Sequence, residues 1–179
     1  QDSAGVTRGR FDTTEKALSL GDGSDGALTV TSGTTTINND SSAAYGIEPL
    51  ASSTQVKSGA GYIPVASTTN FTVGDEILVI QMQGSNAGAY EFKKITNVTT
   101  NTELILDGPL GHTYTEDSSS SAQIVEVPQF TDVTVSSTGV VSIPAWNGSV
   151  GGVMVFRATG TVNCQSSSSC FDTVGKGYR

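Results

Sequence analysis

The residues of this sequence that could do chemistry are few and scattered. The one histidine, His112, follows Pro109-Leu-Gly, and a general base needs both a partner and a pocket. Glu116 and Asp117 stand near it but belong to a Ser-rich loop, so a loop histidine without a catalytic role is favoured. The nucleophile-elbow, zinc-protease and phosphate-loop motifs are all missing from the sequence. We therefore predict that the chain is not an enzyme, with no catalytic residue and no required cofactor.

The candidate metal site is an acidic turn, Gly21-Asp-Gly-Ser-Asp-Gly26. Asp22, Ser24 and Asp25 carry oxygen ligands at a calcium-like spacing, and Ca²⁺ prefers oxygen. An EF-hand loop also has a distant Glu, which this segment lacks. A plain Asp-Gly turn is therefore favoured, and Ca²⁺ is the one ion that the sequence suggests.

Aromatic residues could bind a sugar, because flat ring faces suit pyranose rings. Trp146 lies in the loop Pro144-Ala-Trp-Asn-Gly148, and Tyr114, together with Tyr45 and Tyr90, could complete a stacking platform with it. The alternative is that Trp146 packs over the end of a sheet, and this interpretation is favoured because a lone Trp in an all-β chain is usually structural.

Two cysteines, Cys164 and Cys170, enclose Gln-Ser-Ser-Ser-Ser. The spacing is too wide for a CxxC redox motif, and no neighbouring Cys or His completes a zinc site. We predict a local disulfide that stabilises one loop by roughly 2–2.5 kcal/mol and implies an oxidising compartment; two free thiols are the alternative. The start at Gln1 resembles a mature terminus left after signal-peptide removal, so we expect a secreted, extracellular chain.

Four asparagines fit the N-glycosylation sequon, a motif that arises often by chance in a chain this rich in Ser and Thr. They are Asn39, Asn70, Asn97 and Asn147.

The charge balance excludes some partners. Only 15% of residues are charged, and the net charge is -8 with a pI of about 4.4. A polyanion would be repelled, so we expect no nucleic-acid partner. No stretch approaches the roughly 18 apolar residues of a membrane span, so none is expected.

The sequence patterns around these residues predict short β-strands. Similar strand–turn–strand units recur at 27–37, 132–143 and 155–162, and such recurrence indicates solenoid rungs or repeated hairpins. The segment Gly152–Phe156 is apolar on both faces, which predicts a central, covered strand. Between the first two units, residues 59–115 alternate as four strands of a small antiparallel barrel or sandwich.

We therefore predict an all-β fold of short stacked strands, solenoid-like or sandwich, that carries a small antiparallel β-barrel insert. The predicted domains are an N-terminal arm at 1–20, a main β domain at 21–58 and 116–179, and the insert at 59–115.

Three motifs carry a resemblance to a known class of proteins. They are Phe71-x-x-Gly-Asp-x-Ile77, Tyr90-Glu-x-x-x-Ile95 and Leu104-x-Leu106-x-x-Pro-Leu110-x-x-x-Tyr114. Together they resemble a barrel-like segment beside the solenoid of large secreted bacterial surface and phage tail-fibre β-helix proteins. The pattern departs from that class at Cys164–Cys170, where a plain strand is usual. The resemblance implies an extracellular adhesive or structural role and transfers no catalytic residue.

Two functions follow as hypotheses. The first is a structural or adhesive subunit of a cell-surface filament that self-associates by strand addition, with Arg8 and Arg10 of the arm docking on the acidic body. The alternative is a carbohydrate-binding module of a polysaccharide-degrading or surface protein. Exposed strand edges would favour the first, and exposed aromatic side chains in a groove would favour the second.

Overall fold

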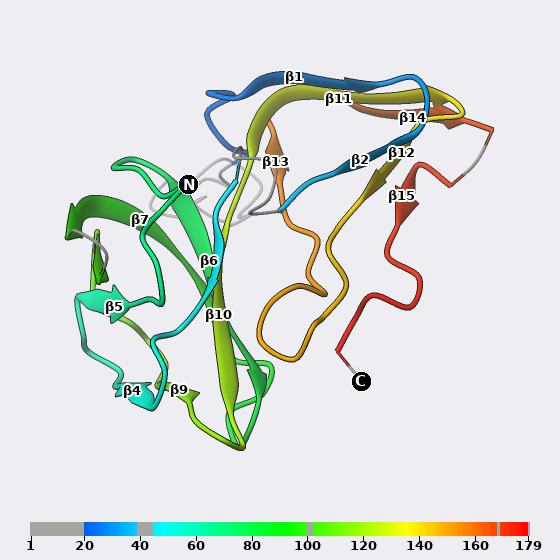
Figure 1. Ribbon diagram of the computed structural model, residues 1–179. Coiled ribbons are helices and arrows are strands. Elements are labelled where there is room, and N and C mark those ends of the chain that lie inside the picture. The colour runs from blue at the N-terminus through cyan, green and yellow to red at the C-terminus, as the bar shows by residue number, and fades with distance from the viewer. Residues whose placement is uncertain (1–19, 39–44, 100–101, 168, 179) are drawn as a thin grey trace, which may run out of the picture.

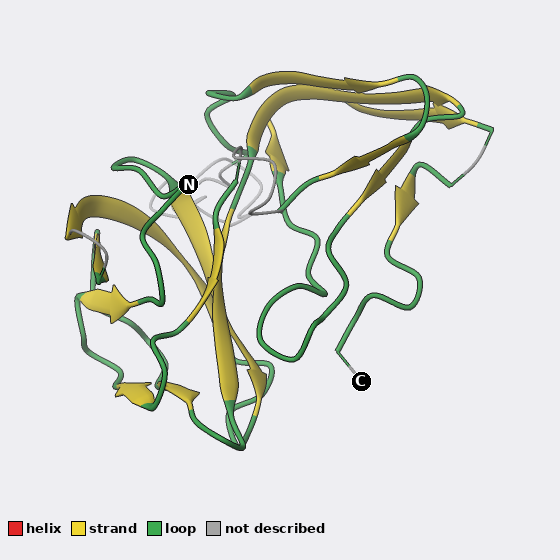
Figure 2. Ribbon diagram, in the orientation of Figure 1, coloured by secondary structure: helices red, strands yellow, loops and turns green. Residues whose placement is uncertain are grey.

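The computed structural model describes residues 20–38, 45–99, 102–167 and 169–178. Every regular element in these ranges is a β-strand, which confirms the all-β prediction (Figure 2). Before the longest strands the chain forms β1 (Gly26–Val30), β2 (Thr34–Thr36), β3 (Ile47–Pro49), β4 (Thr54–Val56) and β5 (Tyr62–Pro64). The middle of the chain forms β6 (Glu76–Gln83), β7 (Tyr90–Thr99), β8 (Glu103–Leu106), β9 (Tyr114–Glu116) and β10 (Ser121–Glu126). The last strands are β11 (Gln129–Ser137), β12 (Val140–Ser142), β13 (Arg157–Ala158), β14 (Val162–Ser166) and β15 (Phe171–Asp172).

Three strand–turn–strand units lie on one another as a parallel stack, drawn across the upper right of Figure 1. We call them rungs: β1 with β2, β11 with β12, and β14 with β15. The middle strand β11 pairs in parallel with β1 and with both β13 and β14, while β12 pairs in parallel with β2 and β15. Parallel, in-register stacking of a repeated unit is how solenoids are built, so the solenoid-like alternative is the correct one.

The core of the stack comes from the inward side chains of these rungs. Val133, Val135 and Val141 of the middle rung are each 0% exposed, and Val30 and Ile143 are almost as deeply buried. Thr134, between the two inward valines of β11, is a β-branched residue with high β-propensity, which helps to explain how a weakly charged sequence still forms sheets.

The second region is a curled antiparallel sheet with the strand order β3-β10-β6-β7-β8-β5. A bridge between Leu50 and Val65 joins its first and last strands, and the amide of Ala51 donates to the carbonyl of Pro64 across the same seam. The short pair β4 and β9 covers one end. Its core is closed and apolar, and this curled sheet is the barrel-like insert that the sequence predicted.

The sheets also include strands from outside residues 59–115. Strands β3, β4 and β10 belong to the curled sheet or to its covering pair, although they precede or follow that range. The predicted division of the chain into domains stays a prediction.

One predicted strand is wrong. Residues 152–156 form no strand and run as an irregular segment between two cores. Val153 and Val155 pack with Leu78 and Val125 on the outer face of the curled sheet, whereas Phe156 packs against the stack. The segment is apolar on both sides for this reason. The preceding Gly151 has φ of 101° and cannot continue a strand ladder.

The two regions are connected through β10, which leads into β11 at Val127 and Pro128 (Figure 1). At this bend Asn38 donates from Nδ2 to the carbonyl of Glu126 at 3.0 Å and accepts from the amide of Val155 at 3.2 Å. Its side chain therefore joins three segments that are far apart in the sequence.

Candidate functional site

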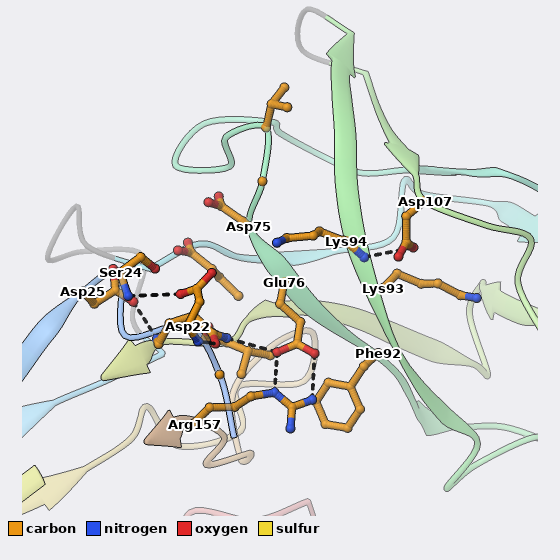
Figure 3. Close-up of a pocket in the computed structure, with 16 residues that line it drawn as sticks. Asp22, Ser24, Asp25, Asp75, Glu76, Phe92, Lys93, Lys94, Asp107 and Arg157 are labelled. Carbon is orange, nitrogen blue, oxygen red and sulfur yellow. Dashed lines mark hydrogen bonds and ion pairs between the residues drawn. The ribbon is translucent and has the colours of Figure 1, made fainter. Parts of the chain in front are cut away.

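A cleft of about 880 Å³ lies where the parallel stack meets the curled sheet (Figure 3). We call it the junction cleft. Its walls come from the turn before β1, the start of β6, the middle of β7 and the bend between β10 and β11. Its charged residues are Asp22, Asp25, Asp75, Glu76, Asp107, Glu126, Lys93, Lys94 and Arg157. The volume is within the range of roughly 300–1,000 Å³ that ligand sites occupy.

An ion pair crosses the junction. Arg157 of β13 donates from Nε to Oε2 of Glu76 at 2.5 Å and from Nη2 to Oε1 at 2.7 Å. Gln129 donates to the same Oε2 at 3.0 Å, and its backbone amide donates to Asp25 at 2.6 Å. The hydrogen bonds from Arg157 to Glu76 raise the pKa of that guanidinium above its ordinary value. This two-bond geometry holds β6 against the stack.

An aromatic pair lies on one face of β7, because alternate residues of a strand point the same way. Phe92 lines the cleft and is 39% exposed, and the neighbouring Tyr90 is 58% exposed. Their ring centroids are 6.3 Å apart in an edge-to-face arrangement. The guanidinium of Arg157 lies 4.8 Å from the centroid of Phe92, which is a cation–π contact.

The carboxyl group of Glu126 is the most unusual in the cleft. The residue is only 9% exposed, and the amide of Gly46 donates to it at 2.7 Å. Burial, together with the nearby charges of Asp75 and Asp25, raises its pKa to about 8 against the opposing effect of that hydrogen bond. At neutral pH this carboxyl group is therefore mainly protonated, unlike an ordinary glutamate.

The predicted metal turn lies at the edge of the junction cleft, with its carboxylates bonded within the chain. Asp22 accepts from the amide of Ser24 at 3.0 Å, and Asp25 accepts from Gln129. The bonds from Ser24 lower the pKa of Asp22. In the part of the chain that the structure describes, no three His, Cys, Asp or Glu side chains could jointly hold a metal ion. Binding of Ca²⁺ by Asp22, Ser24 and Asp25 stays a prediction.

Of the predicted sugar-stacking residues, Tyr90 lies beside the cleft next to Phe92, whereas Trp146, Tyr114 and Tyr45 do not line it. Tyr114 is fully buried, and its hydroxyl donates to Glu91 at 3.1 Å, so its ring does not fit the predicted role. Burial acts to raise the pKa of Glu91, but the hydrogen bonds from the amides of Gly111 and His112 and from Lys93 and Tyr114 together lower it overall. Glu91 thus anchors the loop of His112.

Trp146 packs against the irregular segment around Tyr178, and its predicted place over the end of a sheet stays a prediction. Its ring lies 5.7 Å from that of Tyr178, edge to face, and its amide donates to the carbonyl of Lys176 at 2.8 Å. The ring is half-buried against the last segment of the chain.

The predicted disulfide is confirmed: Cys164 and Cys170 are bonded, and they link β14 to the start of β15. This bond indicates an oxidising compartment. Among the sequons, Asn97 and Asn147 are exposed and Asn70 is half-buried, while Asn39 lies outside the described residues, as do Arg8 and Arg10. Glycosylation and the role of the arm stay predictions. No helix in the described ranges is long and apolar enough to cross a membrane.

The sequence analysis missed Phe92, Glu76 and Arg157 as site residues. The alternation of Tyr90-Glu-Phe-Lys-Lys94 pointed to two aromatic rings on one strand face, and that pattern could have identified the pair. Arg157 carried no such pattern, because its partner Glu76 is 81 residues away.

The arrangement suits recognition of a hydroxyl-rich ligand. Glu76 and Arg157 bond to each other, but other carboxylates of the cleft, such as Asp75 and Asp107, have further acceptor sites for the ring hydroxyls of a sugar. Exposed aromatic faces beside them can cover the apolar face of a pyranose.

No protein-family model matches the chain, and no curated protein matches its sequence. Three solved structures are similar to parts of it. The tailspike gp49 of Pseudomonas phage LKA1 is 16% identical, with a TM-score of 0.36 over 57% of this chain and 22% of the tailspike. The tailspike gp61 of Pseudomonas phage phi297 is 19% identical, with a TM-score of 0.34 over 56% of this chain and 17% of the tailspike.

The third is the tailspike Gp54 of Acinetobacter baumannii bacteriophage AP22, solved in complex with A. baumannii capsular saccharide. It is 13% identical, with a TM-score of 0.40 over 82% of this chain and 28% of the tailspike. The chain thus spans less than a third of the length of each of these structures. These neighbours are phage tailspikes, as the resemblance to phage tail-fibre-like β-proteins predicted.

The same finding corrects one prediction. The chain was predicted not to be an enzyme because known catalytic motifs are missing, and the likeness to tailspikes, one of them bound to a saccharide, contradicts that prediction. The physical reason is that carboxylates from distant segments can catalyse sugar chemistry without a local motif. The junction cleft alone is lined by six carboxyl side chains.

Proposed function

We propose that this chain is an extracellular, surface-adhesive β-module that binds a polysaccharide in the junction cleft. The observation that carries the proposal is the exposed pair Tyr90 and Phe92 on one strand face beside the bidentate Glu76–Arg157 pair. An aromatic surface is thereby adjacent to a cleft lined with carboxylate acceptors, an arrangement that suits a sugar ring.

The test is affinity electrophoresis of the chain in gels that contain different bacterial capsular or exopolysaccharides. We expect at least one polysaccharide to retard the chain, and Phe92→Ala to weaken retardation by about tenfold, as expected for an aromatic contact worth about 1.4 kcal/mol. Tyr62→Ala is the matched control, because Tyr62 is 45% exposed on β5 but does not line the cleft. Equal losses in the two variants, or no retardation by any polysaccharide, would refute the proposal.

A second role, structural assembly by strand addition, is favoured by a separate observation. Among the described strands, β14 and β15 pair only with β11 and β12, and so do β1 and β2, so each end of the parallel stack has a strand edge with no neighbour. An edge with unpaired backbone groups is a template for another strand. Sedimentation of the chain over a hundredfold range of concentration tests self-association; a single monomeric species throughout would argue against a homopolymer.

A further inference from the structure

We infer that the outer edge of β14 is a docking site for one further parallel strand, supplied by a separate polypeptide segment that carries the same repeat pattern as the rungs. The inference starts from the same unpaired stack edge and names the edge, the register and the kind of partner. Because that partner is a separate segment, the inference depends neither on self-association of the chain nor on polysaccharide binding.

The hydrogen-bond ladder identifies which groups face outward. The amide of Val133 in β11 donates to the carbonyl of Thr161 at 2.9 Å, and Val133 is in register with Val162. In a parallel ladder alternate residues of a strand bond to opposite neighbours. Thr161 and Asn163 therefore direct their ladder groups toward β11, and Val162 and Cys164 direct theirs to the outer edge.

Burial differs sharply between the two ends of the stack. In one column Val30, Val135 and Cys164 are in register, and in the next Val133 is in register with Val162. Val30 is 3% exposed and the two middle-rung valines are fully buried, whereas Val162 is 46% exposed and Cys164 is exposed as well. Leu28, the β1 residue in register with Val133, is half-buried. Both β1 and β14 pair with β11 alone among the described strands, but the side chains of the core columns are more exposed at the β14 end than at the β1 end.

The repeat itself defines the partner. Each rung places a polar residue between two small or medium apolar ones, as Leu28-Thr-Val30, Val133-Thr-Val135 and Val162-Asn-Cys164. A fourth strand of this pattern would cover the Val162 column with an apolar side chain and satisfy the outward amides. Natural edges that avoid pairing carry Lys, Pro or a bulge, and β14 has neither residue and pairs with β11 without a register shift.

The experiment follows hydrogen exchange at the amides of Val162 and Cys164 by NMR in the oxidised, full chain. The probe is a synthetic peptide with the sequence of residues 132–143, the middle rung, and the control is a scrambled peptide of the same composition. We expect excess probe to slow exchange at both amides at least tenfold and the scrambled peptide to leave them unchanged. Unchanged exchange with the probe would overturn the inference.

Two variants test whether the outward amide of Val162 bonds to the added strand. Val162→Pro removes the outward amide, whereas Val162→Thr keeps it, so we expect the peptide to bind the Thr variant and not the Pro variant. Equal binding would overturn the inference, and the exchange data on the unmodified chain remain decisive if the Pro variant does not fold. Slowed exchange caused by raising the concentration of the chain alone would assign the edge to a second copy instead of a separate segment. Retention on polysaccharide gels should be the same in both variants, which separates this inference from the proposed binding function.

Discussion

The curled sheet and the parallel stack cover their strand edges and apolar cores in different ways. In the curled sheet the first and last strands meet at the bridge between Leu50 and Val65, so the sheet has almost no open end and its core is complete. In the stack each rung needs a neighbour, and neither end has one among the described strands; the end at Val162 is the one whose core side chain is exposed. The closed sheet needs no further strand to complete its core, whereas the stability of an open stack depends on the strand or cap that covers its end.

The largest expected effect compares these two regions directly. Ile124 of β10 is fully buried in the closed core, so Ile124→Ala should lower the free energy of unfolding by about 2–5 kcal/mol through lost contacts and a residual cavity. Val162→Ala at the open end should lower it by less than about 0.5 kcal/mol, because water already reaches that side chain. Urea unfolding followed by circular dichroism measures both. A loss at Val162 as large as that at Ile124 would mean that the stack is not open.

The second prediction concerns the junction between the two regions, where Glu126 is buried. Its pKa is about 8 in the folded chain and close to 4.5 when unfolded. Below pH 4.5 both states bind the proton and the full stability is present; as pH rises through 8, the folded state is forced to ionise a buried group. Stability should therefore fall by on the order of 3 kcal/mol between pH 5 and pH 8.5.

The matched variant is Glu126→Gln, which resembles the protonated form. It should flatten this fall, and thermal unfolding at several pH values measures it. Carboxyl groups with a lowered pKa, such as Asp22 and Glu91, affect stability only at lower pH, so they do not contribute in this window. The same slope in the variant and the unmodified chain would assign the effect to another group.

The contrast between the regions also explains what the sequence could predict. The first two rungs were predictable because the same pattern recurs, at Leu28-Thr-Val30 and again at Val133-Thr-Val135, and local repetition is visible without coordinates. The third unit was expected at 155–162, but that range holds β13 and only the first residue of β14, so the third rung lies further along the chain. The sequence also showed that residues 152–156 are apolar on both sides, but it did not show that the segment is irregular. The reason is that its two sides pack against two different cores.

The junction cleft was not predictable in the same way. Its central ion pair joins Glu76 to Arg157, which neither alternate with each other nor share a motif. Only the bend from β10 into β11 brings β6 and β13 together, and the sequence around Pro128 does not specify its direction. The raised pKa of Glu126 follows from that same bend, because burial between the regions causes it.

The smallest of the three effects concerns the disulfide at the open end. Cys164 lies on the outermost strand, and Cys170 is buried in the core of the stack. Closing this short loop should contribute about 2 kcal/mol to the free energy of unfolding, so the double variant Cys164→Ser/Cys170→Ser should unfold at lower urea concentration by that amount. Because the curled sheet has its own closed core, the loss should be confined to the stack.

Two probes can test that confinement. Fluorescence of Trp146, the one tryptophan, reports on the segment that packs against Tyr178 beyond the stack, and hydrogen exchange in β6 and β10 reports on the curled sheet. In the double variant the fluorescence transition should move to lower urea while exchange in β6 and β10 changes little. Reducing agent should shift the unmodified chain in the same way and leave the variant unaffected. If both probes report the same loss of stability, the two regions unfold as one unit. The ion pair between Glu76 and Arg157 would then couple the unfolding of the stack to that of the curled sheet, although the sheet has a closed core of its own.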